Sequence, residues 1–156
     1  RKKTAALFAA CTEAAAYSVG VSEEEVKLAR LLGEYIGICF QIKDDIFDYF
    51  DSKEIGKPTG NDMLEGKLTL PVLYALNRAN DNQAAEIALK VKEGTATLAE
   101  IARLIAFTKE NGGIEYAVRT MNAYKQKAFG LLASLPDSAI CVALRSYLDY
   151  VVDREK

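Results

Sequence analysis

The stretch FQIKDDIFDY at residues 40–49 places three aspartates and a glutamine in a run that is otherwise mostly apolar. On a helix, Asp44 and Asp45 both share a face with Asp48, and Gln41 precedes them by one turn. Carboxylates that converge on a largely buried helix repel one another and need a compensating cation. Oxygen ligands favour a hard ion such as Mg2+, which keeps water ligands and bridges to substrate phosphates. The alternative is a solvated acidic helix end, and the triplet by itself does not decide between the two.

The residues that follow, 51–67, predict a loop, because glycine and proline alternate there with charged side chains. Glycines let backbone N–H groups approach a multiply charged anion, and Lys57 and Lys67 add positive charge beside them. Carboxylates that hold a metal beside lysines that hold phosphate predict a metal–diphosphate site, with a solvated loop as the alternative. A Walker phosphate loop is not matched, since its residue order fails and no strand precedes the segment.

Helical periodicity dominates the rest of the chain, and no run alternates like a strand. Ser22 and Thr97 each have a glutamate three residues on, which predicts a capping box at the start of a helix. The helix that begins near Ser22 is expected to run to about Phe50, and Gly33 and Gly37 within it would let a second helix approach closely. We therefore expect one all-α domain over residues 1–156, with about seven helices and no sheet.

Composition excludes several kinds of function. Half of the 156 residues are apolar, 27% are charged, and the formal net charge of −2 gives no reason to expect a nucleic-acid partner. Charges interrupt every apolar run, so no transmembrane helix is expected. Histidine is absent, which excludes a histidine base, a histidine metal ligand and a Ser-His triad among these residues. Cys11, Cys39 and Cys141 are far apart and are expected to be small buried residues in a reducing compartment.

Three motifs in order carry a family resemblance: F-Q-x-x-D-D-x-x-D from Phe40, G-K-P-x-G-x-D from Gly56, and G-K-x-T-L-P from Gly66. Together they resemble the second aspartate-rich region of the trans-isoprenyl (polyprenyl) diphosphate synthases. The pair Lys3-Thr4 resembles the family's Lys-Thr helix, and the segment ending at Arg154 resembles its final helix. The string E-G-K-L-T-L-P is most similar to long-chain heptaprenyl, octaprenyl and solanesyl synthases.

This resemblance implies a helical bundle of the isoprenoid synthase type and a prenyltransferase activity that depends on Mg2+. Such enzymes condense isopentenyl diphosphate head-to-tail onto an allylic diphosphate, here to give a long-chain polyprenyl diphosphate. Carried over residue by residue, the implied roles fall into three sets. The metal ligands would be Asp44, Asp45, Asp48 and Asp62. The diphosphate would be bound by Lys3, Lys57 and Lys67. The reacting centre would be lined by Lys3, Thr4 and Gln41.

The family's first aspartate-rich motif, the arginine pair after it and an N-terminal Gly-Lys-x-x-Arg are not in these 156 residues. Residues 1–156 are therefore expected to be the C-terminal part of one polyprenyl synthase domain and to be inactive alone. The resemblance implies a homodimer in the cytoplasm, with peripheral membrane contact through a lipophilic product. Two alternatives remain: a non-catalytic subunit of a heteromeric prenyl synthase, and another class I terpenoid enzyme such as a cyclase.

Overall fold

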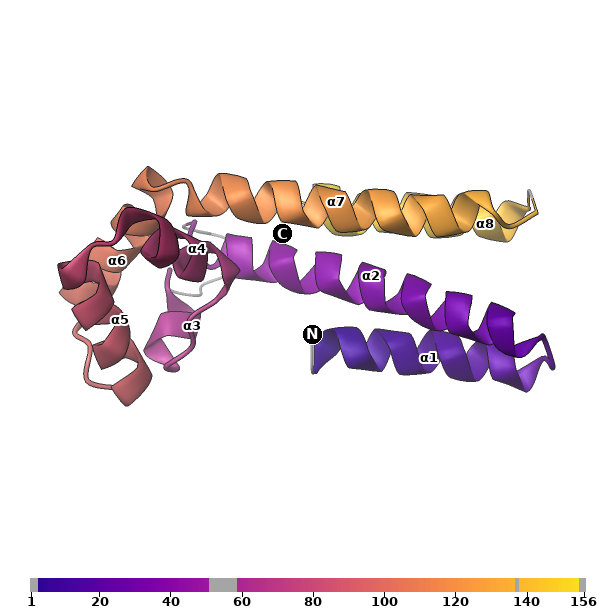
Figure 1. Ribbon diagram of the computed structural model, residues 1–156, viewed down its shortest axis with the longest axis horizontal. Coiled ribbons are helices and arrows are strands. Elements are labelled where there is room, and N and C mark those ends of the chain that lie inside the picture. The colour runs from indigo at the N-terminus through magenta and orange to yellow at the C-terminus, as the bar shows by residue number, and fades with distance from the viewer. Residues whose placement is uncertain (1–2, 51–58, 137, 155–156) are drawn as a thin grey trace. The chain divides into compact units, whose positions relative to one another are not determined.

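The computed structural model describes residues 3–50, 59–136 and 138–154, and within these ranges it contains helices and no strand (Figure 1). The expected all-α fold is confirmed. The described helices are α1 (Thr4–Ser18), α2 (Glu23–Phe47), α3 (Asn61–Leu64), α4 (Leu70–Ala79), α5 (Asn82–Glu93), α6 (Leu98–Glu110), α7 (Gly113–Ala133) and α8 (Ala139–Asp153). The helix beyond the expected seven is α3, a single turn inside the segment that was predicted to be a loop.

The helix boundaries follow the local capping signals. Glu25 Oε2 accepts a 2.9 Å hydrogen bond from the Ser22 backbone N–H, and Thr97 forms the full capping box at the start of α6. The predicted end of α2 at about Phe50 is three residues too far. After Phe47 the chain tightens, and the N–H of Tyr49 donates to the carbonyl of Ile46 at 3.1 Å, an i→i+3 bond typical of a helix end.

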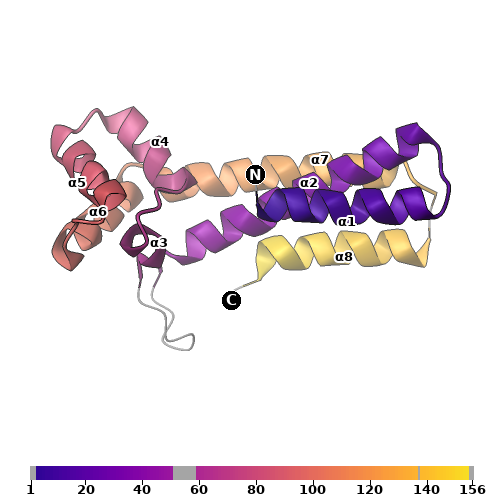
Figure 2. The same cartoon turned by 90° about the horizontal axis from the view of Figure 1, so that it is seen from below.

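The chain divides into two compact units, and the first comprises Arg1–Lys43 and Thr120–Lys156. It contains α1, α8 and most of α2 and α7, which run alongside one another (Figures 1 and 2). The close approach expected at the two glycines of α2 is confirmed. A methyl group on Gly33 would lie 2.5 Å from the carbonyl oxygen of Phe8, and one on Gly37 would lie 2.6 Å from the Cα of Ala5. Only glycine at these positions lets the α1 backbone pack directly on α2.

The outer face of α1 is apolar but exposed. Ala5 and Ala9 are the buried residues of this helix, while the side chain of Leu7 is 64% exposed and Tyr17 is exposed as well. The expectation of three buried cysteines is accordingly confirmed for Cys39 and Cys141 and wrong for Cys11. On a helix, a residue two positions after Ala9 points to the opposite side, so Cys11 faces away from α2.

The second unit, Asp44–Arg119, has its own core between α4, α5 and α6. Its largest fully buried side chain is Tyr49, which lies one residue after the third aspartate of the acidic stretch. The other buried apolar residues of this core are Met63, Val72, Ala84, Ile87, Ala88, Val91, Ile101, Leu104 and Ile105. In the described part of the chain, no helix is both long and apolar enough to cross a membrane.

Candidate functional site

The end of α2 carries the acidic stretch. Asp45 is buried with 8% of its surface exposed, and Asp44 and Asp48 are half-buried. The N–H of Asp48 donates to the carbonyl of Asp44 at 3.3 Å, which keeps Asp48 one helical turn beyond Asp44. Burial raises the pKa of the Asp48 carboxyl, with a further contribution from the neighbouring carboxylates of Asp62 and Glu65, although backbone N–H groups oppose the shift. Carboxylates are thus held partly out of water here, as the sequence predicted.

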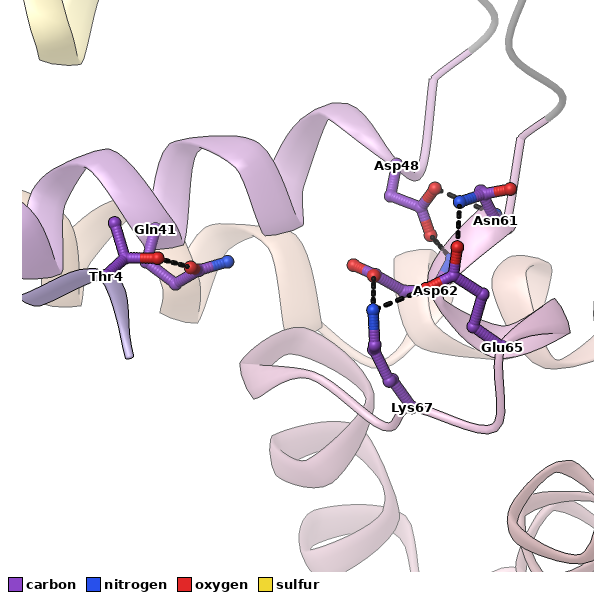
Figure 3. A network of polar contacts seen from close by, with 7 residues as sticks. All are labelled: Thr4, Gln41, Asp48, Asn61, Asp62, Glu65 and Lys67. Atoms are coloured by element: carbon purple, nitrogen blue, oxygen red, sulfur yellow. Dashed lines mark hydrogen bonds and ion pairs between the residues drawn. The ribbon is translucent and has the colours of Figure 1, made fainter. Parts of the chain in front are cut away.

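The carboxylate of Asp48 accepts two backbone hydrogen bonds from the start of α3 (Figure 3). Its Oδ1 accepts from the N–H of Asn61 at 2.8 Å, and its Oδ2 accepts from the N–H of Asp62 at 3.1 Å. These two N–H groups have no acceptor within their own helix, because they belong to its first turn. Asp48 therefore supplies the cap that α3 lacks locally.

Lys67 and its partners form an exposed ion cluster beside this cap (Figure 3). The Lys67 Nζ lies 2.5 Å from Oε2 of Glu65 and 3.7 Å from Oδ1 of Asp62. The hydrogen bond to Glu65 raises the pKa of the Lys67 ammonium, and Asp62 adds to the effect. The amide of Asn61 donates to the other Glu65 oxygen at 3.1 Å. An anion bound at Lys67 would have to compete with these carboxylates.

Thr4 and Gln41 are brought together in the first unit (Figure 3). The Thr4 hydroxyl donates to Oε1 of Gln41 at 2.9 Å and links α1 to α2 across 37 residues of sequence. Lys3, immediately before α1, is exposed. At the other end of the chain, the Arg154 guanidinium lies 4.3 Å from the centre of the Phe40 ring and donates to the Phe40 carbonyl at 3.3 Å.

Lys57 and Asp62 are two further predicted site residues. Lys57 lies outside the described residues. Asp62 is described, and the turn of α3 brings its carboxylate to 3.7 Å from the Lys67 ammonium. Sequence reasoning missed Asn61 and Glu65 in this cluster. Their i, i+4 spacing would have identified them as partners only if the one-turn helix had been foreseen.

The carboxylates at the end of α2 are the candidate donors for a metal ion. Within residues 3–50, 59–136 and 138–154, no three Asp, Glu or Cys side chains gather closely enough to hold an ion by themselves. Mg2+ does not require such a cage, because it usually keeps several waters and binds one or two carboxylates together with substrate phosphates. The half-buried carboxylates at the end of α2 fit that mode of binding. The four aspartates remain predicted ligands.

Comparison with known proteins identifies the class. The family model described as "Polyprenyl synthetase" matches residues 1–108. The chain is 36% identical to heptaprenyl diphosphate synthase component 2 of Geobacillus stearothermophilus, over 99% of this chain and 48% of that protein. This chain therefore belongs to the polyprenyl synthetase family.

Two solved structures share the fold. A crystal structure titled geranylgeranyl pyrophosphate synthase from Bacteroides thetaiotaomicron is 78% identical with a TM-score of 0.95, over 99% of this chain and 51% of that one. A polyprenyl synthase from Caulobacter crescentus CB15, complexed with calcium and isoprenyl diphosphate, is 34% identical with a TM-score of 0.85, over 99% of this chain and 47% of that one. The chain spans about half the length of the relatives it matches.

Proposed function

We propose that these residues are the C-terminal part of a prenyltransferase that condenses isopentenyl diphosphate with an allylic diphosphate. The observation that carries this proposal is the hydrogen-bonded connection from the aspartates of α2, through Asp48, to the Asp62–Lys67 pair. It joins carboxylates suited to a hydrated divalent ion to a lysine suited to a phosphate oxygen. Family membership and the calcium–isoprenyl diphosphate complex of the Caulobacter relative support the same reading.

In the proposed reaction, the allylic C–O bond breaks to give a carbocation and diphosphate, the double bond of isopentenyl diphosphate attacks the cation, and a proton is lost. Bound Mg2+ would stabilise the negative charge that develops on the departing diphosphate. Asp44 would be its main ligand, with Asp45, Asp48 and Asp62 in direct or water-mediated contact. Lys67, with Lys3 and Lys57, would bind the diphosphate oxygens. Thr4 and Gln41 would orient the reacting group.

The proposal that residues 1–156 are half of a larger domain rests on two observations. The relatives are about twice as long as this chain. In addition, α1 is mostly apolar, with Glu13 as its one charged residue, but is buried only at Ala5 and Ala9. A helix with so much apolar surface is normally buried, so further helices are expected to cover the face that carries Leu7.

Product length has two candidates, each favoured by a relative. The sequence resemblance and the Geobacillus relative favour a long-chain, heptaprenyl-type product. The 78% identity to a structure titled geranylgeranyl pyrophosphate synthase favours a shorter one. The word "component" in the name of the Geobacillus relative favours a heteromeric assembly as the alternative to the homodimer that the resemblance implies.

The test is an assay of the complete natural protein with isopentenyl diphosphate, farnesyl diphosphate and Mg2+, with products sized by mass spectrometry. We expect Mg2+-dependent release of diphosphate and a ladder of longer prenyl diphosphates. A cyclised hydrocarbon would instead identify a terpenoid cyclase, and activity only after addition of a second subunit would identify a heteromeric component. Turnover by residues 1–156 alone would contradict the proposal that they are only part of the catalytic domain.

A further inference from the structure

Asp48 uses three oxygen atoms to hold one short segment of backbone. Its carboxylate accepts from the N–H groups of Asn61 and Asp62, and its own carbonyl accepts from the N–H of Gly60 at 2.8 Å. Gly60 is the residue that precedes α3 and has no side chain to cap it. The cap therefore comes from a residue 13 positions upstream of Asn61, at the end of another helix.

The segment that Asp48 holds leads directly to Lys67. The carbonyl of Asp62 accepts from the backbone N–H of Lys67 at 2.8 Å, and the Asp62 carboxylate lies 3.7 Å from the Lys67 ammonium. Two successive hydrogen bonds, from Asp62 to Asp48 and from Lys67 to Asp62, thus fix the backbone of Lys67 relative to the end of α2. The same helix end carries Asp44 one turn earlier.

We propose that Asp48 is a positioning residue, whose main task is to set the distance between the carboxylates of α2 and Lys67 and not to ligate the metal directly. This proposal rests on the proposed function and deepens it. Turning the Asp48 carboxylate toward an ion would break its bonds to two half-buried N–H groups that have no other acceptor within α3. In this proposal the direct ligands are Asp44 and Asp45, which lie within α2.

A metal-free measurement tests the anchoring itself. Hydrogen–deuterium exchange is followed for the peptide that contains Asn61 and Asp62, in the complete protein with EDTA present. Asp48→Ala is expected to speed exchange of these two amides by at least about 10-fold, because Asp48 is their acceptor. Asp48→Asn keeps one acceptor oxygen and should have a smaller effect. Asp44→Asn is the matched control and should leave this peptide unchanged.

Kinetics with Mg2+ tests the consequence for the site. For Asp48→Asn we expect the KM for the allylic diphosphate to rise about 10-fold, while the Mg2+ concentration at half-maximal rate stays within about twofold of wild type. Asp44→Asn should instead raise the Mg2+ requirement strongly. The proposal is overturned if Asp48→Asn raises that requirement as much as Asp44→Asn does, or if exchange of the peptide is unchanged in both Asp48 variants.

The two arms separate this proposal from the proposed function. If the wild-type protein shows no prenyl transfer, the proposed function fails, and the exchange comparison alone decides whether Asp48 anchors α3. If prenyl transfer occurs but the exchange rate of the Asn61–Asp62 peptide is the same in wild type and in both Asp48 variants, only the positioning role fails. Should Asp48→Ala not fold, the milder Asp48→Asn supplies both measurements.

Discussion

The hydroxyl of Thr4 donates a 2.9 Å hydrogen bond to the side-chain oxygen of Gln41. The two residues are 37 positions apart, and the bond ties the first turn of α1 to α2. The bond belongs to the same interface as Gly33 and Gly37, where the backbones of α1 and α2 are in direct contact. The orientation of the Gln41 amide is therefore set by α1 as well as by its own helix.

Replacement of Thr4 by valine should destabilise the 156-residue chain by about 1 kcal/mol, because a part-buried hydrogen bond is lost while the side-chain shape is kept. Urea denaturation measures the change. Ser18→Ala is the control, since it also removes a hydroxyl from α1, but one that is exposed and bonds only to Ala15 in the same helix. Equal losses in both variants would show that the link between α1 and α2 contributes nothing.

Tyr49 gives a contrasting prediction, because we expect its ring, and not its hydroxyl, to stabilise the core of the second unit. The side chain is 1% exposed, and burial raises the pKa of the phenol. The hydroxyls of Thr69 and Thr108 lie near the Tyr49 hydroxyl, yet no hydrogen bond of good geometry to it forms. Tyr49→Phe should thus be neutral or slightly stabilising, whereas Tyr49→Ala should cost about 3–5 kcal/mol.

Thermal and urea unfolding of the two Tyr49 variants decides this point. A loss of more than about 1 kcal/mol in Tyr49→Phe would mean that the hydroxyl has a partner in solution. The burial also bears on the choice of kinetic controls. Although Tyr49 flanks the acidic stretch, its truncation to alanine would disturb the core of the second unit and confuse any test of metal dependence.

Acid should weaken the junction of α5 and α6 through Glu100. The Lys90 ammonium, 2.5 Å away, lowers the pKa of Glu100 from 4.5 to about 2, with help from the Thr97 hydrogen bonds. A carboxyl whose pKa is lower in the folded state than in the unfolded state stabilises the fold at pH values above its unfolded-state pKa. That contribution is present above pH 4.5 and is lost as the pH falls toward 2.

Glu100→Gln isolates this effect, because glutamine also satisfies a capping box but cannot pair with Lys90. Urea midpoints are compared at pH 6, 4, 3 and 2. We expect the variant to be less stable than wild type at pH 6, with a difference that vanishes near pH 2 and shrinks in high salt. A difference independent of pH would assign the effect to the capping box and not to the charge.

The features that could be predicted well are those that depend on residues close together in the sequence. The Thr97 capping box and the close approach at Gly33 were both foreseeable from spacing alone. The one-turn helix α3 was not, because it is too short for a periodic pattern and its cap comes from Asp48. The exposure of Cys11 was missed because small apolar residues recur on every side of α1, so its buried face cannot be recognised from its own residues.

The candidate site was predictable to a similar extent. Local spacing predicts that Asp44 and Asp45 share a helix face with Asp48, since a helix brings residues three and four apart onto one face. The pairing of Thr4 with Gln41 depends on how α1 packs on α2, and only the family resemblance suggested it. The role of Asp48 as a cap depends on where the chain returns after residue 58, and no pattern in the sequence specifies that point.

Asp44 carries the decisive prediction for the proposed reaction. In the complete protein, Asp44→Ala should lower kcat far more than it raises KM, because charge on the diphosphate grows as the C–O bond breaks and metal-held stabilisation acts mainly in the transition state. The loss of one such electrostatic group typically costs about 10²–10³ in rate. Lys67→Ala should chiefly raise the KM for the allylic diphosphate.

Glu110→Ala is the matched control for Asp44→Ala, since it removes an exposed carboxylate from the last turn of α6, outside the acidic stretch. Steady-state rates are measured over a Mg2+ titration for all three variants. The control should follow the wild-type titration, while Asp44→Ala should show a depressed maximal rate at every Mg2+ concentration. If Asp44→Ala kept the wild-type kcat and Mg2+ requirement, the acidic stretch would be only a solvated helix end. A carboxylate that held the ion could not be removed without a loss of rate.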